Sequence, residues 1–285
     1  MTKRLFGEFS GLVKFPSQSL ERDTPLLVAI HGGTYTSTYF NIPGFSLLEL
    51  AAGSGIPVLA PDRSGYGQSP LLEGSDATLI GQARHLSRAL TEAWEQYGEG
   101  TSGMVLIGHS IGGAISLAIA SEPGDLPILG VAVSGVGLRT PPEHRPMWES
   151  LPETAHVDLP STLKDDVMFG PAGSFDSSMP AASHAADAPA VRAELVDIVS
   201  TWHDKVHAVL SGIKVPVHYR QAEFDKLWIV SQSEVDAFAA ALAQSPRVDA
   251  ALVPATGHCM DFHRIGKALQ LQQLGFSLQC ASSRD

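Results

Sequence analysis

A serine between two glycines is the first feature of this sequence that could carry chemistry. The stretch MVLIGHSIGGA, Met104 to Ala114, places Ser110 in a G-x-S-x-G pattern. Apolar residues typical of a buried strand precede the pattern, and an Ala/Ile/Leu-rich segment typical of a helix follows it. At such a junction the glycines allow a strained turn that presents the serine as a nucleophile, whereas elsewhere they would only ease a turn.

A serine hydroxyl is a weak nucleophile without a base, and the base needs an acid to orient it. His258 comes just after an apolar run that ends at Val253, and the carboxylates Glu223 and Asp225 come just after the preceding run. The chain order serine, acid, histidine is typical of nucleophiles and bases at the carboxyl ends of parallel strands. The residues themselves leave both Glu223 and Asp225 open as the acid.

The elements that must position these side chains follow from the apolar pattern. Short apolar runs predict strands buried on both faces, and helical spacing predicts helices between them. Strand and helix in alternation predict an α/β fold, a mostly parallel central sheet with helices on both faces. The predicted strands are residues 5–15, 25–30, 56–60, 104–107, 128–133, 215–220 and 248–253, and the predicted helices include 76–97, 111–121 and 261–279.

The pattern changes between residues 138 and 211, where no clear strand occurs and prolines recur. We therefore expect a body made of residues 1–137 and 212–285, with 138–211 inserted as a helical cap. Trp148, Met168 and Phe169 look exposed within the insertion. They are candidate substrate contacts, although such side chains could instead pack the cap onto the body.

Taken together, these motifs resemble an α/β-hydrolase-fold serine hydrolase, an esterase or lactonase with a cap domain. The resemblance covers nearly the whole chain outside 138–211, whose position matches the cap that this family inserts after the sixth strand. It implies that Ser110 is the nucleophile and His258 the base. It favours Asp225 as the acid, because the family places its acid in a turn a few residues beyond the strand end.

The resemblance also implies an oxyanion hole, formed by two N–H donors that face the developing negative charge. One donor is the backbone N–H of Ile111, the residue after the serine. The other is expected from the loop His31-Gly32-Gly33-Thr34, which resembles the family's HG-x motif. Gly33 is the first choice for this donor and Thr34 the second.

Net charge and composition limit the kinds of binding partner and the cellular location that we expect. The formal net charge of −11 argues against nucleic acid or an anionic membrane surface as the main partner. We find no apolar run long enough for a signal peptide or a membrane span, and free thiols are expected at Cys259 and Cys280, so a cytoplasmic protein is predicted. His203 and His207 only faintly resemble a zinc motif that requires a glutamate, so no metal is predicted.

The sequence thus predicts an enzyme that cleaves an ester or lactone of a mostly apolar small molecule through an acyl-enzyme intermediate, without a cofactor. Two alternatives stay open. The same fold could run other chemistry, as a C–C bond hydrolase, amidase, perhydrolase or cofactor-free dioxygenase. It could also serve as a non-catalytic small-ligand-binding protein, since fold alone does not fix function.

Overall fold

The computed structural model describes residues 3–21 and 23–282. Residues 1–2, 22 and 283–285 of the predicted body therefore lie outside the described residues. Its main sheet has the strand order β1-β2-β4-β3-β5-β6-β9-β10. The pairs β1–β2 and β2–β4 are antiparallel, and every later neighbour pairs in parallel. The strands are β1 (Lys3–Phe6), β2 (Phe9–Lys14), β3 (Leu26–Ile30), β4 (Val58–Pro61), β5 (Met104–His109), β6 (Ile128–Ser134), β9 (Val217–Ala222) and β10 (Val248–Val253).

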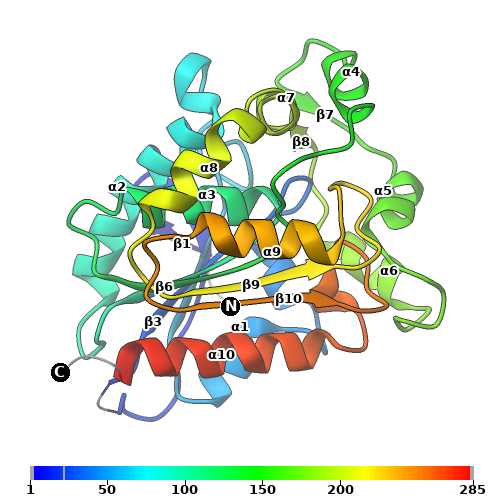
Figure 1. Ribbon diagram of the computed structural model, residues 1–285. Coiled ribbons are helices and arrows are strands. Elements are labelled where there is room, and N and C mark those ends of the chain that lie inside the picture. Colours follow the sequence, from blue (N-terminus) through cyan, green and yellow to red (C-terminus); the bar gives the residue numbers. More distant parts are fainter. Residues whose placement is uncertain (1–2, 22, 283–285) are drawn as a thin grey trace.

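Helices cover both faces of this sheet (Figure 1). On one face lie α2 (Leu79–Tyr97), α3 (Ile111–Ser121), α8 (Trp202–Gly212) and α9 (Gln232–Ala241), and on the other α1 (Leu47–Gly53) and α10 (Gly266–Ser282). Alternate residues of β3 enter opposite cores: Val28 packs in the α2–α3 layer, while Leu27 packs in the α1–α10 layer. Burial on both faces is the reason that the strands are continuous apolar runs. The predicted α/β fold is confirmed.

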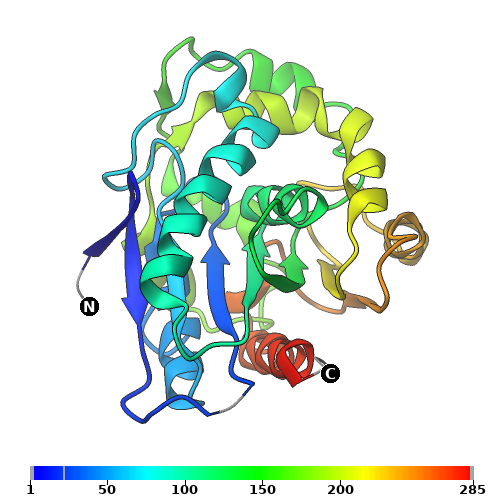
Figure 2. The same cartoon turned by 90° about the vertical axis from the view of Figure 1, so that its left-hand side faces the viewer.

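Between β6 and β9 the chain forms α4 (His144–Glu149), α5 (Ser161–Met168), α6 (Met179–Ser183) and α7 (Arg192–Ser200). Two short strands, β7 (His156–Val157) and β8 (Ala190–Val191), pair antiparallel. Both have only two residues, too few to give a recognisable apolar run in the sequence. In Figure 2, α4 and α7 lie at the top, above the arrowhead of β3, and Figure 1 shows α5 and α6 beyond the arrowheads of β9 and β10.

Helix α8 falls inside the range predicted for the insertion, yet it packs against α3 and α9 beside the sheet. Its first residue, Trp202, is buried and donates a hydrogen bond from Nε1 to the Gly137 carbonyl (2.9 Å). The layer of helices on the body therefore begins before residue 212. The division of the chain into a body and a cap domain stays a prediction.

Short 3-10 helices complete the chain: η1 (Ser37–Asn41), η2 (Gly74–Ala77), η3 (His184–Ala186) and η4 (Met260–Phe262). Within residues 3–21 and 23–282, none of the helices is long and apolar enough to cross a membrane.

Candidate active site

Ser110 lies between the last residue of β5 and the first of α3, with φ 55° and ψ −125°. Non-glycine residues rarely adopt this left-handed region, and such strain is common at active sites. Both glycines of the motif are required by close approach. A Cβ on Gly108 would lie 2.4 Å from Ser116 Oγ, and one on Gly112 would lie 2.1 Å from the Ile30 carbonyl oxygen. The predicted strand–turn–helix context of the motif is confirmed.

Asp225 and His258 lie together beyond the ends of β9 and β10. Their side chains are buried, and His258 Nδ1 lies 2.8 Å from Asp225 Oδ2. The carboxylate also accepts hydrogen bonds from Gln221 Nε2 (3.0 Å) and the Leu227 backbone N–H (2.9 Å). Because the carboxylate is an acceptor, Nδ1 of the imidazole carries a proton and donates it to this bond. Nε2 is then the ring nitrogen that faces away from the carboxylate and can take a proton.

Glu223, the other candidate acid, points elsewhere. Its side chain is exposed, and Oε2 accepts a hydrogen bond from the Ala255 backbone N–H (2.7 Å). It therefore supports the loop that precedes His258 instead of contacting the imidazole. The structure brings Asp225, not Glu223, to His258.

His109 connects the serine turn to the imidazole of His258. The ring centroids of His109 and His258 are 4.8 Å apart, and Tyr39 stacks on His109 at 4.8 Å. Burial is the main cause that lowers the pKa of His109 well below its usual value, so its ring is neutral. Among the described residues no hydrogen bond joins Ser110 to His258; such bonds often tighten only when substrate binds.

The loop after β3 brings a candidate oxyanion donor beside the serine. A Cβ on Gly33 would lie 3.1 Å from Ile111 Cδ1, so Gly33 and Ile111 are neighbours. The Thr34 backbone N–H donates to Tyr66 Oη (3.2 Å), while the Gly33 N–H makes no hydrogen bond within the described part of the chain. Ile111 is the first residue of α3, and its N–H has no acceptor within the helix. Of the two expected choices in the loop, Gly33 is the one with an available N–H.

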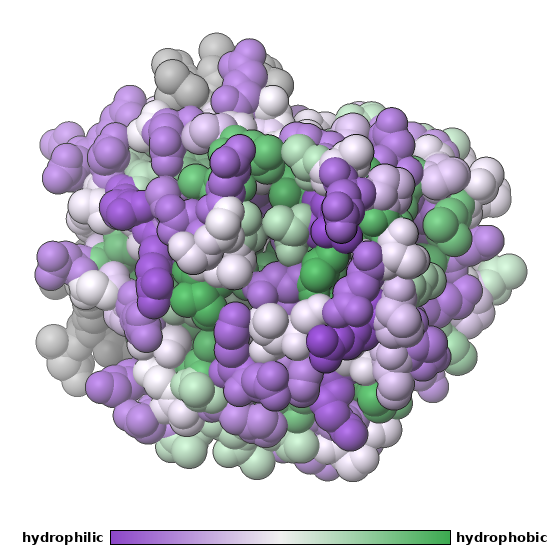
Figure 3. Space-filling view, turned by 90° about the horizontal axis from the view of Figure 1, so that it is seen from above, coloured by the Kyte–Doolittle hydropathy of each residue, from purple (hydrophilic) through white to green (hydrophobic). Residues whose placement is uncertain are grey.

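A cavity of about 370 Å³ opens beside Ser110, Ile111 and Gly33. Most of its surface is apolar and comes from the segment between β6 and β9. Seen from above, hydrophobic residues gather around hollows in the middle of this face, with hydrophilic residues around them (Figure 3). The apolar side chains that line the cavity include Met147, Trp148, Leu163, Val167, Met168, Leu195, Ile198, Val199 and Trp228.

The three predicted substrate contacts differ in their placement. Trp148 is half-buried and lines the cavity, and Met168 lines it while only 7% exposed. Phe169 is 4% exposed and packs against Phe175 (ring centroids 4.9 Å apart) instead of lining the cavity. The expectation that Met168 and Phe169 are exposed was wrong. Their segment packs onto the His258 loop, where the Cys259 N–H donates to the Met168 carbonyl (2.9 Å), and sequence spacing does not reveal such a contact.

Two other titratable groups near the site, His31 and Cys259, are uncharged. Burial, and then the Arg63 charge, lower the pKa of His31 to about 3. Burial raises the pKa of the Cys259 thiol, so it stays protonated and is not a nucleophile. Cys259 and Cys280 are both buried free thiols. Across residues 3–21 and 23–282, no three His, Cys, Asp or Glu side chains form a group that could hold a metal ion, and His203 and His207 are exposed.

Tyr66 and Glu194 belong to none of the predicted motifs, yet both reach the loop around Gly33. Tyr66 belongs to the turn-rich stretch after β4. Its position just beyond a predicted strand end was the one sequence feature that indicated a place near the site. Glu194 had no signal, because its partners lie more than a hundred residues earlier in the chain.

Comparison with known proteins agrees with this architecture. The profile of the alpha/beta hydrolase family matches residues 27–265, so the chain belongs to that family. No curated protein sequence matches it. Among solved structures it is similar to a thermophilic esterase from Thermogutta terrifontis (18% identity, 97% of this chain and 98% of that chain, TM-score 0.68). It is also similar to a monoacylglycerol lipase from Paleococcus ferrophilus (18% identity, 96% of this chain and 99% of that chain, TM-score 0.67). A third similar structure is an N-acyl homoserine lactonase (15% identity, 100% of this chain and 99% of that chain, TM-score 0.65).

Proposed function

We propose that this alpha/beta hydrolase family member is a serine hydrolase that cleaves an ester or lactone bond in a mostly apolar small molecule. One observation carries the proposal. Ser110, strained at the junction of β5 and α3, opens onto an apolar cavity of about 370 Å³, and the buried Asp225–His258 pair lies beside the same turn. A strained serine next to an oriented histidine is the arrangement that acyl transfer requires.

In the proposed first step, His258 Nε2 takes the proton of the Ser110 hydroxyl while Oγ attacks the substrate carbonyl carbon. Asp225 holds the imidazole in the tautomer that leaves Nε2 unprotonated, and it stabilises the imidazolium that forms. The carbonyl oxygen becomes negatively charged and accepts hydrogen bonds from the N–H groups of Ile111 and Gly33.

The tetrahedral intermediate then collapses. The bond from the carbonyl carbon to the leaving oxygen breaks, and His258 Nε2–H gives its proton to that oxygen, which leaves an acyl ester on Ser110. Water attacks this ester in the second half of the reaction, with His258 again taking and returning a proton. These steps use only side chains, backbone N–H groups and water.

The substrate class follows from the surface around the serine. The cavity lining is mostly apolar and includes Ser110, so it offers apolar contact to the part of the substrate that does not react. An esterase, a lipase and a lactonase are among the structures similar to this chain, which supports ester or lactone chemistry. The partner we propose is therefore a small molecule, bound with its carbonyl at Ser110.

A panel of aryl esters, lactones (including large rings) and amides tests this proposal, assayed on the wild type and on Ser110→Ala. We expect turnover of at least one ester or lactone by the wild type and its loss in the variant. Turnover that survives in Ser110→Ala would contradict the serine mechanism. Turnover of amides alone would contradict the substrate class.

A further inference from the structure

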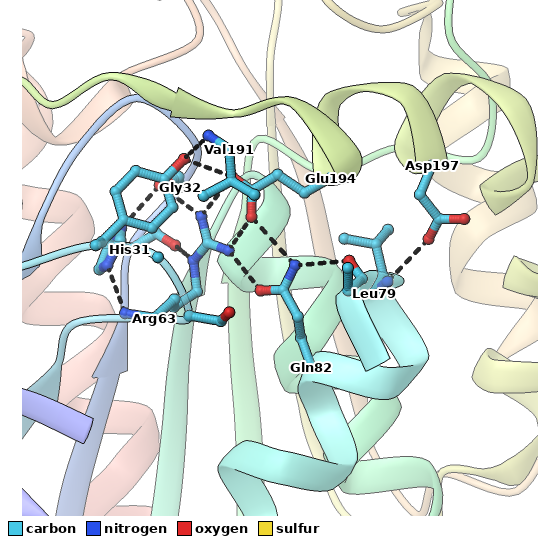
Figure 4. A network of polar contacts seen from close by, with 12 residues as sticks. His31, Gly32, Arg63, Leu79, Gln82, Val191, Glu194 and Asp197 are labelled. Carbon is cyan, nitrogen blue, oxygen red and sulfur yellow. Dashed lines mark hydrogen bonds and ion pairs between the residues drawn. The ribbon is translucent and has the colours of Figure 1, made fainter. Parts of the chain in front are cut away.

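A buried ion pair joins the segment between β6 and β9 to the body, close to the oxyanion loop. Arg63 follows β4, and Glu194 lies on α7 (Figure 4). Arg63 Nη1 lies 2.5 Å from Glu194 Oε2, and Nη2 lies 3.0 Å from Oε1. The two side chains are 1% and 0% exposed. Removing a charged pair from water carries a large desolvation penalty, so its retention here calls for a reason.

The remaining donors of Arg63 hold the backbone of the oxyanion loop. Nε donates to the His31 carbonyl (2.7 Å) and Nη2 to the Gly32 carbonyl (3.0 Å), while the Arg63 backbone N–H donates to His31 Nε2 (3.0 Å). A guanidinium is a planar fork with donors in fixed directions. Glu194 binds one edge of the Arg63 guanidinium and so fixes its orientation. The remaining N–H groups of the guanidinium then fix the directions of the His31 and Gly32 carbonyls.

The direction of the Gly32 carbonyl determines the direction of the Gly33 N–H. The two groups belong to one peptide unit, and there is no cis peptide bond in the described residues. In a trans peptide the N–H points opposite to the C=O. Because the Gly32 carbonyl points at Arg63, the Gly33 N–H points away from Arg63. This is the N–H that we assign to the oxyanion hole.

Through Tyr66, Glu194 also supports the backbone of Thr34, the residue after Gly33. Tyr66 Oη donates to Glu194 Oε1 (2.6 Å) and accepts from the N–H groups of Thr34 and Val191 (both 3.2 Å). Thr34 has φ 66°, a left-handed conformation that is strained for a β-branched residue and needs support from its surroundings. Glu194 thus reaches the backbone on both sides of Gly33.

The two buried charges of this network, on Arg63 and Glu194, are stabilised because they pair with each other and with polar neighbours. Burial opposes the charged form of Arg63, but the Glu194 carboxylate more than offsets this effect and raises the arginine pKa. Gln82 on α2 completes the network, accepting from Arg63 Nη1 (3.1 Å) and donating to Glu194 Oε2 (3.3 Å).

We propose that Glu194 is a positioning residue for the oxyanion hole: through Arg63 and Tyr66, this side chain of α7 holds the Gly33 N–H in the direction that receives the substrate oxygen. The inference rests on the proposed hydrolase function and extends it, because it makes the segment between β6 and β9 part of the catalytic geometry. A purely structural role would instead only fasten α7 to the body.

The same helix offers a matched control. Asp197 lies one turn after Glu194, is buried, and accepts a hydrogen bond at Oδ2 from the Leu79 N–H at the start of α2 (2.8 Å) (Figure 4). Like Glu194, it is a buried carboxylate that fastens α7 to the body. Its hydrogen bonds go to Leu79 and Thr201 and do not include the oxyanion loop.

The test compares Glu194→Gln with Asp197→Asn, using kcat and KM for a turned-over ester and the affinity of a trifluoromethyl ketone that forms an oxyanion on the serine. Removing one oxyanion donor lowers kcat by about 10²–10³, so we expect a misdirected donor to lower it by about 10- to 100-fold in Glu194→Gln with KM nearly unchanged. Ketone affinity should fall by a similar factor. Asp197→Asn should keep both values near those of the wild type.

A folded Glu194→Gln with wild-type kcat would overturn the inference, and so would an equal loss of kcat in Asp197→Asn. Because Arg63 loses a charged partner in Glu194→Gln, that variant could unfold. Tyr66→Phe then decides, since it keeps the ion pair and removes only Oη; we expect kcat to fall by about tenfold at similar KM, and wild-type kcat would overturn the inference. A wild type inactive on every ester and lactone contradicts the proposed function itself, a result distinct from an active wild type with normal variants.

Discussion

At the scale of single residues, Ser110 owes its conformation to its neighbours and not to its own hydroxyl. The close contacts of Gly108 and Gly112 enforce the turn, and the Ser110 backbone N–H donates to the Ser134 carbonyl (2.9 Å). Removing the hydroxyl leaves all of these contacts in place. The chemistry of the site and its folding can therefore be separated by substitution.

We predict that Ser110→Ala and His258→Ala each lower turnover by about 10⁴- to 10⁶-fold, because the nucleophile and its base act as one unit. Ser110→Ala should leave the unfolding midpoint almost unchanged. Steady-state kinetics and urea denaturation of the same preparations check both statements. Retention of more than a tenth of wild-type turnover by Ser110→Ala would show that the reaction does not pass through this serine.

The two carboxylates after β9 give a second residue-scale prediction. Asp225→Asn should lower kcat by about 10⁴-fold, because the amide favours the wrong imidazole tautomer in His258. Glu223→Gln should have little effect, since Glu223 is exposed and contacts the Ala255 backbone. If Glu223→Gln proved the more damaging change in kcat, the acid would have to be reassigned.

At the scale of elements, predictability depended on whether the signal was local. The change from strand to helix at Ser110 was predicted at the correct residues, because an apolar run, two glycines and a helical segment all lie within eleven positions. The contacts of α7 were not predicted. They join Glu194 to Arg63 and Tyr66 across more than a hundred residues, and no spacing rule encodes such an approach.

The elements between β6 and β9 should govern substrate preference. Met168 lines the cavity, whereas Met179, equally apolar and buried, does not line it. We predict that Met168→Ala changes the ratio of kcat/KM between a long-chain and an acetyl ester by about 10-fold or more, since one apolar contact contributes about 1–3 kcal/mol. Met179→Ala should reduce stability without changing that ratio. Equal ratios in both variants would move substrate selection elsewhere, such as to the loop after His31.

At the scale of the whole molecule, buried histidines link stability to pH. His218, on β9 beneath α10, is 1% exposed and packs against Phe276 (ring centroids 5.6 Å apart). Burial, and then the Arg220 charge, lower its pKa from 6.5 to about 4, and Asp249 acts in the opposite direction. Below pH 6.5 the His218 imidazole therefore binds a proton in the unfolded chain, whereas in the folded chain it binds one only below about pH 4.

The stability that His218 contributes is present above pH 6.5 and is lost as pH falls toward about 4. The free energy of unfolding should fall by ~1.4 kcal/mol per pH unit from this residue. We predict that His218→Leu removes this part of the acid sensitivity, measured by urea denaturation at several pH values. Turnover of the substrate found in the proposed assay should be unchanged near neutral pH, because His218 does not line the cavity at Ser110. A variant with the wild-type pH slope would contradict the prediction.

The central claim is that Ser110 forms a covalent acyl-enzyme, and covalent labelling tests it most directly. The protein would be treated with a fluorophosphonate and the adduct mapped by peptide mass spectrometry. We predict one adduct per chain, on Ser110, with no labelling of Ser110→Ala and strongly slowed labelling of His258→Ala. An unlabelled wild type, or a label that persists on another residue in Ser110→Ala, would contradict the account.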